Sequence, residues 1–175
     1  LLSCRGGGTD ATSSNSELMS TDSSPPSITL LGDASISVER GLAYSDRGAS
    51  SDTGESVTVD ASLVDTSVVG TYTVTFNAVD AAGNQAAEVT RTVNVIDTIA
   101  PVISLIGDAE VSITRGSPFT DQGATSDTGE TVILDASSVD TSTVGRYIAT
   151  YNAADSSGNE AVEVIRSINV QPAVL

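Results

Sequence analysis

The stretch Val64–Asn84 reads VDTSVVGTYTVTFNAVDAAGN and decides the fold. Its centre, Thr71–Val79, alternates apolar with polar residues, and the apolar positions are Tyr72, Val74, Phe76 and Ala78. A period of two with one apolar face predicts a half-buried antiparallel strand. The Asp-Thr-Ser segment before it and the Asp-x-x-Gly-Asn segment after it are typical turn sequences.

The same stretch returns at Val139–Asn159 as VDTSTVGRYIATYNAADSSGN. Around it, Pro26–Val95 aligns with Pro101–Val170 without a gap, at a constant offset of 75 residues, and 40 of the 70 aligned positions are identical. Register kept over that length indicates a duplicated domain. We call residues 26–95 the first repeat and residues 101–170 the second repeat.

Each repeat has the size of a small independent β-sandwich. Short β-type runs between turn signals predict about seven strands, including the following in the first repeat: Ile28–Leu31, Ile36–Glu39, Tyr44–Ala49, Val57–Asp60, Thr71–Val79 and Ala87–Val95. The prediction is an all-β chain with two tandem immunoglobulin-like Greek-key β-sandwiches, over residues 26–97 and 98–171. Residues 1–25 form a lipobox remnant and a Gly/Ser-rich tether that is expected to be disordered.

The charge balance excludes several functions. There are 23 acidic residues against 7 basic ones, all arginine, for a net charge of −16. Such a surface repels nucleic acid. Histidine is absent and Cys4 is the only cysteine, so neither an intrachain disulfide nor a Cys/His zinc site is available. Without histidine or lysine only carboxylates remain for catalysis, and nearly all the aspartates lie at turns, so we predict no enzyme.

Four residues are predicted to be structural. Tyr72 and Tyr147 begin the penultimate strands, where they suit a tyrosine corner, and the alternative is an ordinary core tyrosine. Arg91 and Arg166 occupy the apolar phase of the last strand. An arginine there is expected at an edge or rim, with its stem on the core and its head on a carboxylate, and the alternative is a ligand contact.

A family resemblance rests on four motifs present in both repeats: P-x-I-x-L-x-G-D, Y/F-x-D-x-G-A, V-D-T-S-x-V-G-x-Y and D-x-x-G-N. This pattern resembles bacterial surface Ig-like domains, which also occur as tandem modules in a pesticidal crystal toxin. The resemblance implies the sandwich fold, in modules that serve as spacers, adhesive units or accessory domains. Many members carry D-N-x-D-G-D in one loop, where this chain has only the shorter Asp52–Glu55 and Asp127–Glu130 segments.

The segment Leu1-Leu2-Ser3-Cys4 looks like a bacterial lipobox, with an apolar residue three positions before the cysteine and a small residue directly before it. In such lipoproteins cleavage precedes the cysteine. Cys4 is therefore predicted to be acylated and to anchor the chain to a bacterial outer membrane or cell surface. The alternative is an unmodified cysteine.

Acidic loops at one end of the second repeat predict a cation site. Asp97, Asp127, Asp155 and Asn159 are expected to meet there, and calcium takes six to eight oxygens from such groups. The alternative is that these are solvated turn residues.

These features together predict a non-catalytic cell-surface lipoprotein region, whose Ig-like modules act as spacers or adhesive units that project a further domain or mediate contacts with other proteins. One alternative is a carbohydrate-binding module, which needs exposed aromatic residues, whereas the six aromatics here fall in core positions. Another is a filament subunit that polymerises through an exposed strand edge.

Overall fold

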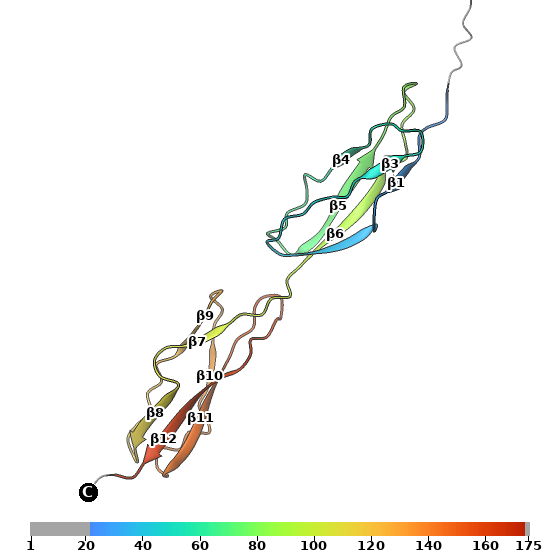
Figure 1. The fold of residues 1–175 in the computed structure, drawn as a ribbon. Coiled ribbons are helices and arrows are strands. Elements are labelled where there is room, and N and C mark those ends of the chain that lie inside the picture. Colours follow the sequence, from blue (N-terminus) through green and yellow to red (C-terminus); the bar gives the residue numbers. More distant parts are fainter. Residues whose placement is uncertain (1–21, 174–175) are drawn as a thin grey trace, which may run out of the picture. The chain divides into compact units, whose positions relative to one another are not determined.

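The computed structural model describes residues 22–173, and in this part of the chain every regular element is a β-strand (Figure 1). The strands of the first repeat are β1 (Ile28–Leu30), β2 (Ser35–Glu39), β3 (Ala49–Ser51), β4 (Thr58–Asp60), β5 (Gly70–Asn77) and β6 (Val89–Ile96). Those of the second are β7 (Ile103–Leu105), β8 (Glu110–Thr114), β9 (Ala124–Ser126), β10 (Ile133–Asp135), β11 (Gly145–Asn152) and β12 (Val164–Gln171).

Each repeat forms two sheets. In the first repeat β1 pairs with β3, and a four-stranded sheet has the order β2-β6-β5-β4. In the second repeat the corresponding sheets are β7-β9 and β10-β11-β12-β8. The short strands β2 and β8 run parallel to β6 and β12. The pairs β1–β3, β4–β5, β7–β9, β10–β11 and β11–β12 are antiparallel. The chain therefore changes sheets between its first and second strands, as in an immunoglobulin-like sandwich.

The core of the second repeat lies between its two sheets. Ile103 of β7 packs with Ala149 and Tyr151 of β11 and with Ile168 and Val170 of β12, all of them buried. In the first repeat the buried apolar residues are Val74, Phe76, Ala78, Val93 and Val95. The alternating pattern of the longest strand therefore predicts its buried face correctly.

Contacts between Cα atoms divide the chain into two compact units. One unit runs to Ala34 and includes Asp46–Leu63 and Thr73–Arg91. The other consists of Ser35–Ser45, Val64–Tyr72 and everything from Thr92 onward. The segment between the repeats and the acidic loops of the second repeat therefore belong to one unit.

Two predictions of local structure are wrong. The structure has six strands in each repeat instead of about seven, and Tyr44–Ala49 is not a strand. The chain is irregular there: Gly48 has a φ of 81°, and its N–H donates to the Asp46 carboxylate at 2.5 Å. An aspartate that accepts from a nearby backbone N–H offers the backbone an alternative to strand pairing. The strand accordingly starts only at Ala49.

Candidate functional site

The Asp-x-x-Gly-Asn loop of the second repeat is closed by its own side chains. Asp155 accepts hydrogen bonds from the backbone N–H of Asn159 at 2.9 Å and from its side-chain amide at 2.8 Å. These bonds to Asn159 are the main reason that the pKa of Asp155 lies below its usual value. Gly158 has a φ of 88°, which an L-residue adopts only under strain. The first repeat closes the same loop with Asp80 and Asn84.

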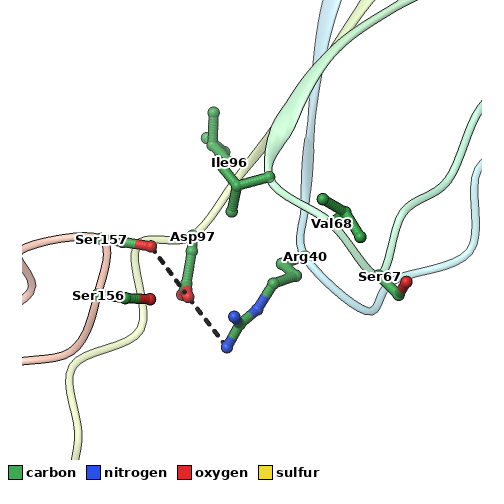
Figure 2. A pocket seen from close by; sticks show the side chains of 8 residues that line it. Arg40, Ser67, Val68, Ile96, Asp97, Ser156 and Ser157 are labelled. Atoms are coloured by element: carbon green, nitrogen blue, oxygen red, sulfur yellow. Dashed lines mark hydrogen bonds and ion pairs between the residues drawn. The ribbon is translucent and has the colours of Figure 1, made fainter.

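Asp97, which lies between the repeats in the sequence, is held by three neighbours. Its carboxylate accepts from Arg40 at 3.1 Å and from the Ser157 hydroxyl at 3.3 Å (Figure 2). Its backbone carbonyl accepts from the side-chain amide of Asn159 at 3.0 Å. The next residue, Thr98, donates its N–H and its hydroxyl to Glu39. The Asp97 side chain is consequently only 5% exposed.

Two hollows adjoin Asp97 in the same compact unit. The one in Figure 2 has a volume of about 520 Å³, and the other, of about 170 Å³, is lined by the acidic residues Asp97, Asp127, Glu130 and Asp155 together with Arg40. Asp127 accepts from the Val102 N–H at 2.8 Å. Glu130 accepts from the hydroxyls of Ser126 and Thr128, which lowers its pKa although the charge of Asp155 acts in the opposite direction. The carboxylates around this hollow therefore already bind groups of the fold.

A second polar arrangement is buried inside each repeat. Arg91 and Arg166 are 2% and 1% exposed, and each forms an ion pair with one carboxylate, of Asp46 and Asp121 respectively. In the second repeat the guanidinium also donates to the carbonyls of Asp108 at 3.0 Å and Ile106 at 2.6 Å. These bonds tie β12 to the loop between β7 and β8. The predicted rim position is wrong, because the arginine is fully enclosed, whereas the predicted carboxylate partner is present.

The ring beneath each guanidinium distinguishes the repeats. Arg91 lies 5.3 Å from the centre of the Phe76 ring, and Arg166 lies 5.5 Å from that of Tyr151, both within cation–π range. The Tyr151 hydroxyl donates to Asp121 at 2.5 Å. Burial, helped by that hydrogen bond, raises the pKa of Tyr151 to about 12.

The two corner tyrosines bond backwards along the chain. The Tyr72 hydroxyl donates to the carbonyl of Val68 at 2.9 Å, and the Tyr147 hydroxyl to that of Thr143 at 3.0 Å. A bond to the backbone a few residues upstream is the geometry of a tyrosine corner. Both rings are half-buried, so full burial is not needed for the corner.

Comparison with known proteins agrees with this architecture. The family described as "Bacterial surface protein, Ig-like domain" matches the chain twice, over residues 28–95 and 103–170. The chain belongs to this family. Bacterial surface Ig-like domains are generally non-catalytic, and membership indicates a cell-surface or extracellular location.

The chain is also similar to a eukaryotic protein. It is 27% identical over 165 residues to hyalin of Strongylocentrotus purpuratus, a match that covers 85% of this chain. The same match covers 14% of hyalin, so this chain spans a small part of that relative's length. The role of a whole protein therefore does not follow from this similarity.

The four residues of the predicted cation site lie in one compact unit of this Ig-like chain. Asp97 and Asn159 are hydrogen-bonded to each other, and Asn159 is bonded to Asp155. Within residues 22–173, no group of three or more His, Cys, Asp or Glu side chains is gathered as a metal site would require. Calcium binding at these residues stays a prediction.

Asp46 and Asp121 are not among the residues predicted from the sequence. Each lies in the Y/F-x-D-x-G-A motif, between an aromatic residue and a Gly-Ala pair. Two features of the sequence could have indicated the ion pairs. An aspartate recurs in this motif of both repeats, and an arginine occupies the apolar phase of the last strand, where a buried charge needs a partner. Cys4 lies outside the described residues. The described part of the chain has no helix long and apolar enough to cross a membrane.

Proposed function

We propose that the chain is a non-catalytic display module of a bacterial surface lipoprotein, whose Ig-like repeats act as spacers or adhesive units. One observation carries this proposal. Among residues 22–173, every buried side-chain nitrogen or oxygen has a hydrogen-bond partner. Buried arginines and aspartates bond to each other and to backbone carbonyls, and turn carboxylates cap their own loops. In this part of the chain the buried polar groups thus serve the fold, which supports a non-catalytic module.

Carbohydrate binding is less well supported. Sugar platforms use exposed aromatic rings, and all six aromatic residues of the chain are buried or half-buried. Protein contacts suit the surface better, because large apolar side chains are exposed, among them Leu63 and Val162. A glycan array tests the alternative, and specific glycan binding by the purified chain would favour it. Edge-to-edge polymerisation, the other alternative, would appear as filaments in electron micrographs.

The spacer role is testable by removing one whole repeat. Deleting residues 26–100 joins the tether to Pro101 in the same register, because the repeat offset is 75 residues. An epitope is fused after Leu175 and the chain is displayed on bacteria with a thick surface layer. If the repeats act as a spacer, antibodies should bind the epitope less well on the shortened chain than on the full chain. Equal access, together with a loss of attachment to other cells or matrix, would instead identify an adhesive unit.

We propose that the chain is anchored to a membrane through an acylated Cys4. Expressed behind a lipoprotein leader in a Gram-negative host, the chain is expected to fractionate with the outer membrane and to enter the detergent phase. Cys4→Ser is expected to release it as a soluble exported protein. A substitution of the neighbouring Ser3 by Ala or Gly keeps a small residue before the cysteine and serves as the control. Membrane fractionation that persists in Cys4→Ser would contradict the anchor.

A further inference from the structure

The chain enters and leaves the second repeat at opposite ends of one strand. β12 begins at Val164, and the hollow beside this residue is also lined by Ala100 and Pro101, where the chain enters the repeat. The chain leaves the repeat after Gln171, the last residue of β12. A β-strand rises about 3.3 Å per residue, so the two points are about 23 Å apart along β12. A pull on the two ends of the repeat therefore acts along this strand.

The strand next to β12 carries the same load in the opposite direction. β8 pairs with β12 in parallel, from Glu110 opposite Ser167 to Thr114 opposite Gln171 (Figure 1). β8 is connected through β7 to the N-terminal end of the repeat, whereas β12 leads directly to its C-terminal end. Because the two strands are parallel, tension pulls them in opposite directions along one ladder. The hydrogen bonds of this ladder are then loaded together, instead of one after another from an open end.

The residues that flank β8 show which of its backbone groups face β12. Ala109 accepts from β12 through its carbonyl at 2.8 Å, and Arg115 donates to β12 through its N–H at 2.8 Å. Since a strand has a period of two, the N–H of Val111 also faces β12 and the N–H of Ser112 faces away. β8 is the last strand of its sheet, so the N–H of Ser112 lies outside the ladder.

The buried arginine extends this attachment to the segment before β8. The Arg166 guanidinium projects from β12 and donates to the carbonyls of Ile106 at 2.6 Å and Asp108 at 3.0 Å. Both residues lie between β7 and β8, directly in the path of the load. Upstream of them, β7 is paired with β9. The chain from Ile103 to Arg115 is thus bonded in turn to β9, to the guanidinium and to β12.

We propose that each repeat bears tension along the chain, and that the parallel pair β8–β12, or β2–β6 in the first repeat, resists it. The first repeat has the same elements, because β2 pairs with β6 in parallel and Arg91 donates to the carbonyls of Leu31 and Asp33. A load on the chain in the cell rests on the proposed display role, in which a bound partner pulls on an anchored module. The resistance itself belongs to the repeats and is measured on the purified chain, so its test and the anchoring test fail independently.

Pulling single molecules in two directions tests the proposal. In the full chain with Cys4→Ser, handles are attached to cysteines at exposed positions, I99C/A173C in one variant and I99C/V162C in the other. The first pair pulls on β8 and β12 from opposite ends, whereas the second pair pulls from the end where β12 begins. At the same force, the second repeat should unfold at least about tenfold more slowly with the first pair, because several bonds must break together. Equal rates overturn the proposal.

Two proline substitutions in β8 form a matched pair. V111P removes an N–H that faces β12, whereas S112P removes one that faces away. Under tension between residues 99 and 173, V111P should raise the unfolding rate about fivefold or more, and S112P should leave it unchanged. A V111P chain that unfolds as slowly as S112P overturns β8–β12 as the resisting element. The two pulling directions need no substitution in β8, so they decide the proposal even if V111P does not fold.

Discussion

The two repeats keep the same buried ion pair and change their outward face. Each encloses an arginine, Arg91 or Arg166, that bridges an aspartate to backbone carbonyls above an aromatic ring. The outward faces of the four-stranded sheets instead exchange threonine for isoleucine or arginine. Because both repeats contain the buried ion pair, we infer that it stabilises the fold. Residues that bind a specific partner are expected at positions where the two repeats differ. Each repeat also serves as the internal control for the other.

The largest expected effect comes from removing a buried arginine. Arg166→Met leaves Asp121 buried without its cation and deprives the carbonyls of Ile106 and Asp108 of a donor. Breaking such a pair costs about 3–5 kcal/mol, comparable with the whole stability of a domain this small. We expect the second repeat to unfold while the first stays folded, as followed by amide resonances of each repeat.

Arg91→Met is expected to do the reverse, and to unfold the first repeat. Arg115→Met, at an exposed arginine, is the control and should change stability by less than about 0.5 kcal/mol. If Arg166→Met behaves like this control, the buried pair does not hold the repeat together.

The next largest effect is expected at alkaline pH, where the second repeat should lose stability and the first should not. The pKa of Tyr151 is raised to about 12, so between its ordinary value near 10 and about 12 the unfolded chain loses this proton and the folded chain keeps it. Stability that is present below pH 10 is thus lost as the pH rises, by about 2 kcal/mol. The first repeat has Phe76 there and lacks this loss.

Urea unfolding of each repeat as a function of pH measures this difference. Tyr151→Phe should remove the alkaline slope of the second repeat, and Phe76→Tyr should introduce one into the first. Equal slopes for the wild-type repeats would show that the buried hydroxyl does not resist ionisation.

Much of this comparison was predictable from sequence. Alternation over Thr71–Val79 and the constant repeat offset predict the long strand, its buried face and the tandem sandwich. The enclosed arginine was not predicted, because its partner Asp121 is 45 residues away and only the fold brings them together. Tyr44–Ala49 is not a strand, because the Gly48 N–H bonds to the Asp46 carboxylate and Gly48 has a φ of 81°, neither of which a strand pattern reveals. The exposure of Ile133, Ile148 and Ile165 on one side of the sheet is evident only once burial and strand register are known.

A smaller effect is expected at the tyrosine corner. Tyr72→Phe removes one hydrogen bond, from the hydroxyl to the Val68 carbonyl, and keeps the half-buried ring. One such bond contributes about 1 kcal/mol net. Tyr147→Phe should cost the second repeat a similar amount, because its bond to Thr143 has the same geometry. Thermal unfolding of the single and double variants measures both, and a loss near zero at either site would make that tyrosine a simple packing residue.

The smallest expected effect is that of calcium. Asp97, Asp127 and Asp155 correspond to Asp22, Asp52 and Asp80 of the first repeat. Of these six aspartates, all within residues 22–173, only Asp97 forms an ion pair with an arginine. A cation at the second repeat must displace Arg40 from Asp97 and Asn159 from Asp155, so we expect binding in the millimolar range. At a calcium concentration equal to Kd, stabilisation is RT ln 2, or about 0.4 kcal/mol, and the melting temperature rises by about 2 °C.

Asp97→Ala with Asp155→Ala should abolish the rise, whereas Asp22→Ala with Asp80→Ala reports on the first repeat alone. Sodium at matched ionic strength is the decisive comparison, because an equal rise with sodium would mean that calcium only screens the charge of −16.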